Sequence, residues 1–141
     1  FVIDDCWQWP RNKTTHELLA DLTRFPSGML NFSDHVHSLG FKFGLYTDRG
    51  IHTCAGRPAS QGHEPKDAAT FASWNVDFVK NDGCGDHDCW AAPLHRGKPS
   101  VCDASGRRKA LCKYERMHKA LRDTGRDIVH AISGYQPWYA E

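Results

Sequence analysis

The stretch Val76-Asp77-Phe78-Val79-Lys80-Asn81-Asp82 decides the fold class of this chain. Its apolar residues form a run too short for a helix, and the run stops at a carboxylate. A short apolar run of this kind predicts a buried strand that ends in polar groups. A helical pattern precedes this strand, and strands that alternate with helices are typical of a parallel sheet.

Three further runs share this character, at residues 1–3, 41–46 and 127–132. Segments with apolar residues at helical spacing lie between the runs, at residues 28–39, 66–74 and 111–125. Pro65 suits the first turn of the second helix, and glycines suit the C-terminal caps of the other two. Alternating strands and helices predict an α/β protein with a parallel sheet covered by crossover helices.

Composition narrows the class of protein. The 141 residues are enough for one domain, and a net charge of +1 excludes a dedicated nucleic-acid binder. No apolar run approaches the roughly 18 residues that cross a bilayer, so we expect no membrane partner. The chain begins at Phe1 without a charged segment before an apolar stretch, and we expect it to be internal to a longer product.

The cysteines indicate the compartment. Six cysteines in so short a chain favour an oxidising environment, in which thiols pair as disulfides. Asn12-Lys13-Thr14 and Asn31-Phe32-Ser33 fit the acceptor pattern for N-glycosylation and point the same way. We therefore expect a secreted or lysosomal protein.

Chemically useful side chains follow the predicted strands. They are Asp4, Asp5, Tyr46, Asp48, Lys80, Asp82 and Ser133. Because the C-terminal ends of parallel strands meet at one rim, we expect these residues to gather there. Paired carboxylates with an aromatic residue suit a carbohydrate, whereas no glycine-rich phosphate loop supports a nucleotide. The simpler alternative is that each carboxylate caps a helix or binds loop amides.

Six blocks in order carry a resemblance to a known family: Asp4-Asp5-Cys6-Trp7, Arg24-Phe25-Pro26-x-Gly28, Gly40-Phe41-Lys42-Phe43-Gly44-Leu45-Tyr46-x-Asp48, Thr53-Cys54-Ala55-Gly56, Asp67-Ala68-x-Thr70-Phe71-Ala72-x-Trp74-x-Val76-Asp77 and Lys80-x-Asp82-x-Cys84. These blocks resemble the family 27 glycoside hydrolases, which include α-galactosidases and α-N-acetylgalactosaminidases. The resemblance implies a (β/α)8 TIM barrel. A whole barrel takes about 250 residues, so we expect residues 1–141 to be a fragment of a single catalytic domain that holds family strands two to five.

The resemblance also implies roles for individual residues. Asp82 is the expected nucleophile of a retaining glycoside hydrolase, and Lys80 beside it is expected to keep that carboxylate ionised. Asp4, Asp5, Tyr46 and Lys80 are expected to bind the sugar, while Trp7 suits either a wall of the site or a packing position. No metal and no cofactor are implied, and the partner is an α-galactoside or α-N-acetylgalactosaminide.

Cysteine pairing follows from the same resemblance. It implies a disulfide between Cys54 and Cys84, and it implies a partner for Cys6 upstream of Phe1. Cys89, Cys102 and Cys112 remain, and one pair among them leaves an odd thiol. The resemblance leaves a homodimer of the full-length protein open.

Several departures from the family pattern matter for function. The family's acid/base aspartate lies on the sixth strand, and nothing after Ser133 is aligned with it. A non-catalytic half-barrel or a sugar-binding remnant is therefore the alternative to an enzyme. At the fifth strand Ser133 suits N-acetylgalactosamine, but the residues after it do not follow the family pattern, so the choice between the two sugars stays open. Asn81 replaces a common aromatic residue beside the nucleophile.

A metal-binding module is a further hypothesis from a different class. Its ligands would come from Cys84, His87, Cys89, Cys102 and Cys112. Thiolates and an imidazole bind zinc, but these spacings match none of the common paired-cysteine patterns. The glycosidase is the stronger prediction.

Overall fold

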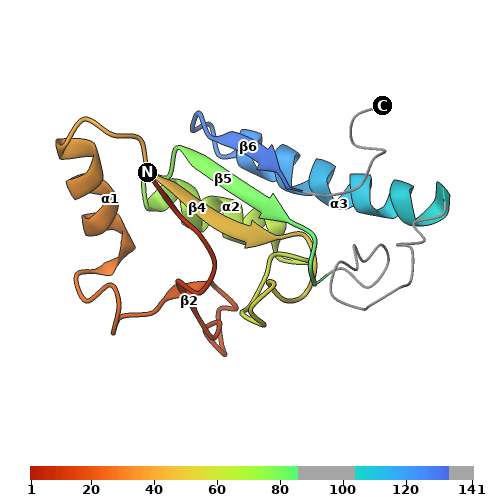
Figure 1. Ribbon diagram of the computed structural model, residues 1–141, viewed down its shortest axis with the longest axis horizontal. Helices are drawn as coiled ribbons and strands as arrows, with labels where there is room; N and C mark the ends of the chain where they lie inside the picture. The colour runs from red at the N-terminus through yellow and green to blue at the C-terminus, as the bar shows by residue number, and fades with distance from the viewer. Residues whose placement is uncertain (86–103, 134–141) are drawn as a thin grey trace, which may run out of the picture.

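The computed structural model describes residues 1–85 and 104–133, which form an α/β unit around a parallel sheet (Figure 1). The sheet has the order β1 (Val2–Ile3), β4 (Gly44–Asp48), β5 (Phe78–Asp82) and β6 (Val129–Ile132). All three neighbouring pairs run parallel. The predicted fold class is confirmed, and within the described residues the four strands form an open sheet that covers part of a barrel.

Three helices connect these strands: α1 (Gly28–Ser38), α2 (Glu64–Ser73) and α3 (Ala104–Asp123). Helices α2 and α3 contact one another and lie behind the sheet in Figure 1. The first two helices match their predicted ranges within two residues, and Pro65 lies in the first turn of α2 as expected. The third begins at Ala104, before the predicted start at Leu111.

The strands β4 and β5 both end two residues later than the predicted strands, which covered residues 41–46 and 76–80. Phe41 is 61% exposed, and pairing of β4 with β1 starts only at Gly44. Likewise, β5 begins at Phe78, two residues after the predicted start at Val76. As a consequence, Asp48 and Asp82 are the last residues of paired strands and not members of the following loops.

The core lies between the sheet and the helices. Leu45 and Val79 point from β4 and β5 into this layer, where they are fully buried with Phe71 of α2 and Met117 of α3. Burial of each such side chain contributes about 1.5–3 kcal/mol. The helices therefore fix the sheet from one face, and the alternating residues of the strands are left to the other face.

Trp7 belongs to this core. It is 1% exposed and makes edge contacts with Phe71 and Trp74, and its indole N–H donates to the backbone oxygen of Tyr46 at 2.9 Å. Of the two roles considered for Trp7, the structure supports packing. The indole also ties the loop after β1 to the middle of β4.

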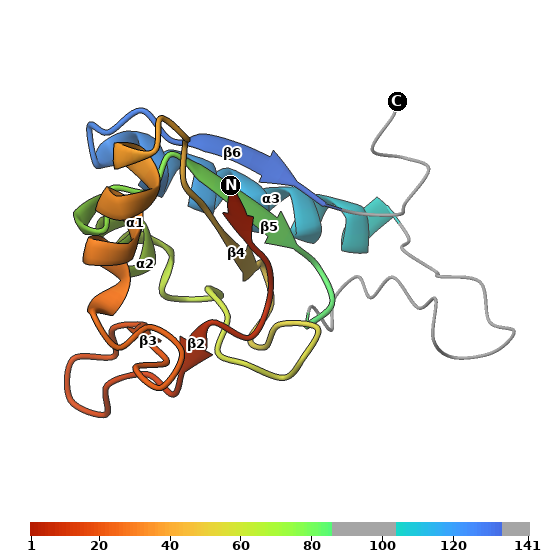
Figure 2. The same cartoon turned by 60° about the vertical axis from the view of Figure 1, so that its left-hand side comes forward.

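A small antiparallel pair was not expected from the polar sequence of residues 8–21. It joins β2 (Gln8–Trp9) to β3 (Leu19–Ala20), and Figure 2 shows it set apart from the main sheet. Both terminal nitrogens of Arg11 donate to the carboxylate of Asp67 on α2, at 2.7 and 2.6 Å. The β2–β3 pair was not predicted, because strands of two residues are too short to show an alternating pattern.

Asp77, directly before β5, connects several segments at the N-terminal edge of the sheet. It accepts the backbone N–H of Phe43 at 2.9 Å and contacts the side chains of His37, Lys42 and Arg126. These partners come from α1 and from the segments that lead into β4 and β6. Among the described helices, none is long and apolar enough to cross a membrane.

Candidate active site

The register of the parallel strands places the predicted site residues in two rows on the face opposite the helices. Tyr46 pairs with Lys80, and extending the β1 register by one residue brings Asp4 into the same row. Asp48 pairs with Asp82 one step further toward the C-terminal ends. Alternate residues of a strand share a face, so both rows open on the same side.

Lys80 and Asp4 form the charged part of the first row. The ammonium Nζ lies 2.7 Å from Asp4 Oδ2, and it also lies 5.0 Å from the centre of the Tyr46 ring. Partial burial acts to raise the pKa of Asp4, but the hydrogen bond from Lys80, the backbone N–H of Asp5 and the charge of Lys80 together outweigh it and lower that pKa. Within the described residues Lys80 has no ion pair with Asp82, so its ionic partner differs from the predicted one.

Tyr46 links the first row to Asp82. Its hydroxyl lies 3.2 Å from Asp82 Oδ2 and 3.1 Å from Cys54 Sγ. Because Cys54 is in a disulfide it has no thiol proton, and the phenol is therefore the donor to both acceptors. Burial, and next the charge of Asp82, raise the pKa of Tyr46, which keeps this donor protonated.

The predicted disulfide between Cys54 and Cys84 is present, with Cα atoms 4.9 Å apart. This separation lies inside the range of roughly 4.4–6.8 Å that disulfide geometry requires. The bond connects the loop after β4 to the loop after β5, two residues beyond Asp82. Cys6 and Cys112 are free thiols within the described part of the chain.

Asp5 binds backbone amides. Its two carboxylate oxygens accept the N–H of Cys6 at 2.7 Å and that of Ala55 at 2.9 Å. This is the simpler of the two roles considered for a strand-end carboxylate, and it ties the loop of Cys54 to the end of β1. Each oxygen has a second lone pair, which leaves Asp5 able to accept a sugar hydroxyl as well.

Ser133 follows β6 at the same rim. Its backbone N–H donates to the backbone oxygen of Asn81 at 2.9 Å, and its own backbone oxygen accepts a hydrogen bond from the hydroxyl of Tyr114 at 2.9 Å. Continuing the β5–β6 register by one residue sets Ser133 beside Asp82. The structure therefore brings Ser133 to the predicted site, although its residue type does not decide which sugar is bound.

Asp48 is the site residue whose role the sequence did not indicate. Its exposed fraction is 0%, and it accepts backbone N–H groups from Gly50, Cys84 and Gly85. Burial raises the pKa of this carboxyl to about 6, against the opposing effect of the N–H donors. Its place at the site could be predicted, because Asp48 follows Tyr46 by two residues on a strand and therefore lies on the same face.

The donor set at this rim does not suit a metal ion. Ligand atoms of Asp48, Cys54, Asp82 and Cys84 lie within 4.8 Å of one another. However, the two sulfurs are joined in a disulfide and offer no thiolate, which is the form that binds a metal. Of the residues in the zinc hypothesis, His87, Cys89 and Cys102 lie outside the described ranges, and Cys84 is committed to Cys54.

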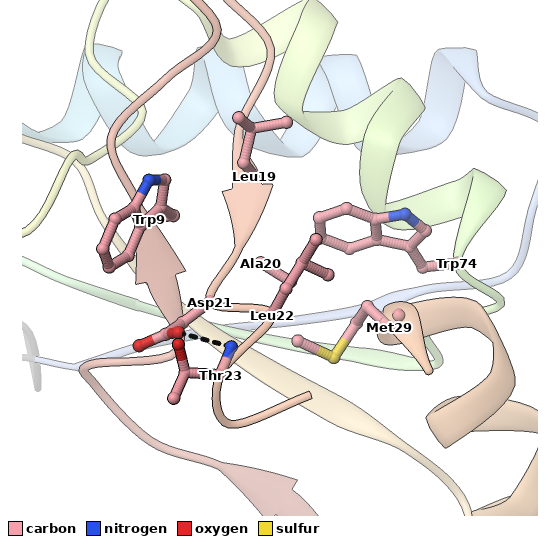
Figure 3. Close-up of a pocket in the computed structure, with 9 residues that line it drawn as sticks. Trp9, Leu19, Ala20, Asp21, Leu22, Thr23, Met29 and Trp74 are labelled. Atoms are coloured by element: carbon pink, nitrogen blue, oxygen red, sulfur yellow. Dashed lines mark hydrogen bonds between the residues drawn. The ribbon is translucent and has the colours of Figure 1, made fainter. Parts of the chain in front are cut away.

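A separate apolar hollow of about 550 Å³ lies between the β2–β3 pair and helices α1 and α2. Figure 3 shows Trp9 and Trp74 on two sides of it, with Leu22 between them and Met29 below Trp74. The hollow contains none of the predicted site residues. Its wall offers few polar groups, whereas the rim around Asp82 offers carboxylates, an ammonium and a phenol.

A partial parallel barrel with carboxylates and a lysine gathered at the C-terminal rim is typical of a sugar hydrolase. Comparison with known proteins identifies the family. The alpha galactosidase A family model matches residues 1–140, and the chain belongs to this family of glycoside hydrolases. It is 39% identical over 139 residues to alpha-galactosidase A of Cellvibrio japonicus and 42% identical over 132 residues to alpha-galactosidase mel1 of Schizosaccharomyces pombe.

These alignments cover 96% and 93% of this chain but 30% and 27% of the two relatives. Solved structures agree. The α-galactosidase of Saccharomyces cerevisiae with raffinose superposes with a TM-score of 0.78 at 33% identity, over 95% of this chain and 26% of that one. α-Galactosidase I of Mortierella vinacea gives 0.79 at 35% identity, over 95% and 30%. The predicted family is confirmed, and the chain spans less than a third of these relatives.

Proposed function

We propose that the protein containing this chain is a secreted, retaining α-galactosidase in which Asp82 is the nucleophile. The observation that carries the proposal is the setting of the Asp82 carboxylate. It ends a barrel strand, accepts a hydrogen bond from Tyr46, and lies one row from the Lys80–Asp4 pair. Family membership supports the reaction class, and the named relatives are α-galactosidases.

In the proposed reaction Asp82 Oδ attacks the anomeric carbon, and the bond from that carbon to the leaving oxygen breaks. An acid protonates the leaving oxygen, and the sugar is held as an ester of Asp82. The acid, now deprotonated, acts as a base and takes a proton from a water molecule. The water oxygen attacks the anomeric carbon, and the ester bond to Asp82 breaks. Two inversions leave the configuration retained, and no cofactor takes part.

The acid in this scheme comes from outside the described strands. A retaining enzyme places its two carboxyl groups about 5–5.5 Å apart, and Asp48 is the nearby candidate in this chain. However, Asp48 is fully buried and both of its oxygens accept backbone N–H groups, so it cannot reach a leaving group. We assign the acid to the aspartate that the family resemblance places on the sixth strand.

Asp4, Asp5, Tyr46 and Lys80 form the proposed sugar subsite. Charged oxygen acceptors and an ammonium donor bind hydroxyl groups through hydrogen bonds that are stronger than neutral ones. The structure of the S. cerevisiae relative was solved with raffinose, which supports a galactoside as the substrate class. Ser133 stays in the proposal as the residue that faces the 2-substituent of the sugar, with galactose and N-acetylgalactosamine as the two alternatives.

The proposal is tested on the complete gene product. Nitrophenyl α-galactoside and nitrophenyl α-N-acetylgalactosaminide are assayed in parallel, and the anomer released first is identified by NMR. We expect turnover with retained configuration, and we expect Asp82→Asn to abolish it while thermal unfolding is unchanged. The matched control is Asp123→Asn, an exposed carboxylate on α3. Equal activity of Asp82→Asn and the parent contradicts the nucleophile assignment, and sugar binding without turnover in the parent favours the sugar-binding remnant.

A further inference from the structure

The backbone that follows Asp82 is held from the neighbouring strand by one buried carboxylate. Asp48 Oδ2 accepts the N–H of Cys84 at 2.6 Å and that of Gly85 at 3.4 Å, while Oδ1 accepts the N–H of Gly50 at 2.7 Å. These donors lie in two loops, the one after β4 and the one after β5. A single side chain therefore connects both loops that border Asp82.

Asp48 suits this task because a carboxylate presents two oxygens with about four acceptor positions and no donor. An amide in its place has one oxygen, and its NH₂ group faces N–H donors. Burying a carboxylate is costly unless it is hydrogen-bonded. Burial raises the pKa of Asp48 to about 6, and the backbone N–H groups oppose that rise, so near neutral pH the side chain is the ionised acceptor.

Gly85 shows how closely the second loop is packed. A Cβ atom at Gly85 would clash with the backbone oxygen of His52, so no larger residue fits at this position. The backbone N–H of Ile51 donates to Gly85 at 3.3 Å, and the backbone N–H of Arg49 donates to Asp82 at 2.9 Å. The segment after Asp82 is thus pressed against the segment after Asp48, with the Asp48 carboxylate between them.

We propose that Asp48 is a positioning residue for catalysis, which fixes the direction of the Asp82 carboxylate by holding the backbone at Cys84 and Gly85. This inference rests on the proposed function of Asp82. Asp48 does not touch the substrate, because it is fully buried. Displacing a reacting group by about 1 Å costs roughly 100-fold in rate, so loss of this support acts on the chemical step more than on sugar binding.

The test compares Asp48→Asn with Asp67→Asn in the complete protein. Asp67 is also fully buried and also hydrogen-bonded, but its carboxylate binds the side chains of Arg11 and Ser60, whereas the amides of Cys84 and Gly85 donate to Asp48. We expect Asp48→Asn to lower kcat about 10- to 100-fold with KM within about twofold. We expect Asp67→Asn to lower the melting temperature and to leave kcat within about twofold of the parent.

A second readout does not depend on activity. Hydrogen exchange at the amides of Cys84 and Gly85 is followed in both variants, and we expect Asp48→Asn to speed it at least tenfold and Asp67→Asn to leave it unchanged. If Asp48→Asn fails to fold, Asp48→Glu replaces it and is expected to lower kcat at unchanged KM. An unchanged kcat in the folded variant, or unchanged exchange at these amides, overturns the proposal. An inactive parent with faster exchange in the variant refutes the proposed function and leaves the role of Asp48 as a support of this loop.

Discussion

Lys80 and Asp4 form an ion pair of 2.7 Å between strand β5 and the residue that follows β1, 76 positions apart in the sequence. The pair spans β4, whose Tyr46 ring lies under the ammonium. Its side chains are 31% and 64% exposed, so the pair is open to solvent on the face opposite the helices. Exposed pairs of this kind add little to stability, typically about 0–1 kcal/mol. A role in binding explains the arrangement better than a role in folding.

The first prediction follows from that exposure. Replacing Lys80 with Met in the complete protein should raise KM for an α-galactoside or lower kcat/KM at least tenfold, because an ammonium donor to the sugar is lost. Urea unfolding should change by less than about 1 kcal/mol. Lys119→Met, which removes an exposed helical ion pair of α3, is the control and should change neither quantity. Unaltered kcat/KM in Lys80→Met refutes a role for the pair in the sugar subsite.

The second prediction concerns the hydrogen bond from Tyr46 to Asp82. Tyr46→Phe removes the phenol oxygen and keeps the ring that packs under Lys80. Hydrogen bonds to charged groups contribute about 1.5–3 kcal/mol, so kcat should fall roughly 10- to 100-fold. Steady-state kinetics at saturating substrate measure the effect. A variant as active as the parent shows that the phenol does not assist Asp82.

The sequence could predict the sheet because its strands are short, apolar and separated by clear helical patterns. It could also predict which residues meet at the rim, since parallel strands deliver their C-terminal ends to one edge. The partner of Lys80 could not be predicted in this way. Asp82 is two residues away on the same strand, but an extended strand sets these two side chains about 6–7 Å apart, while Asp4 is brought alongside by pairing through β4.

The role of Asp48 could not be predicted from the sequence either. Its place in the motif Tyr46-x-Asp48 was visible, but its three backbone donors become neighbours only once the loops after β4 and β5 are folded. The β2–β3 pair escaped prediction because its strands are too short to show alternation. Local patterns therefore gave the elements, and contacts between loops gave the details of the site.

The third prediction tests the N-terminal rim. Asp77→Asn should destabilise the complete protein by about 2–4 kcal/mol, because Lys42, Arg126 and the hydrogen-bonded His37 lose a carboxylate that is only 11% exposed. Asp123→Asn, at an exposed pair on α3, should change stability by less than about 0.5 kcal/mol. Urea denaturation of both variants measures the difference. Similar midpoints for the two would show that Asp77 is not a structural centre.

The last prediction concerns pH and His130, which lies on β6 between the sheet and α3. Its ring stacks on His118 at 5.9 Å and lies 3.1 Å from the Asn81 amide nitrogen. Burial, and next the charge of His118, lower the pKa of His130 from 6.5 to about 4. The unfolded chain therefore binds a proton between about pH 6.5 and pH 4 that the folded chain does not, and stability falls as the pH drops through this window.

The size of this effect is about 1–2 kcal/mol, reduced from the full linkage value because the ring is partly exposed. His130→Gln keeps a polar partner for Asn81 and removes the titration, so its unfolding midpoint should lose less than the parent's between pH 7 and pH 4.5. Asp48, whose pKa is raised to about 6, stabilises the folded state toward acid, but it is present in both proteins and cancels in the comparison. His35→Gln, at an exposed position of α1, should keep the pH response of the parent. The same pH response in His130→Gln and the parent would remove His130 as the source of acid sensitivity.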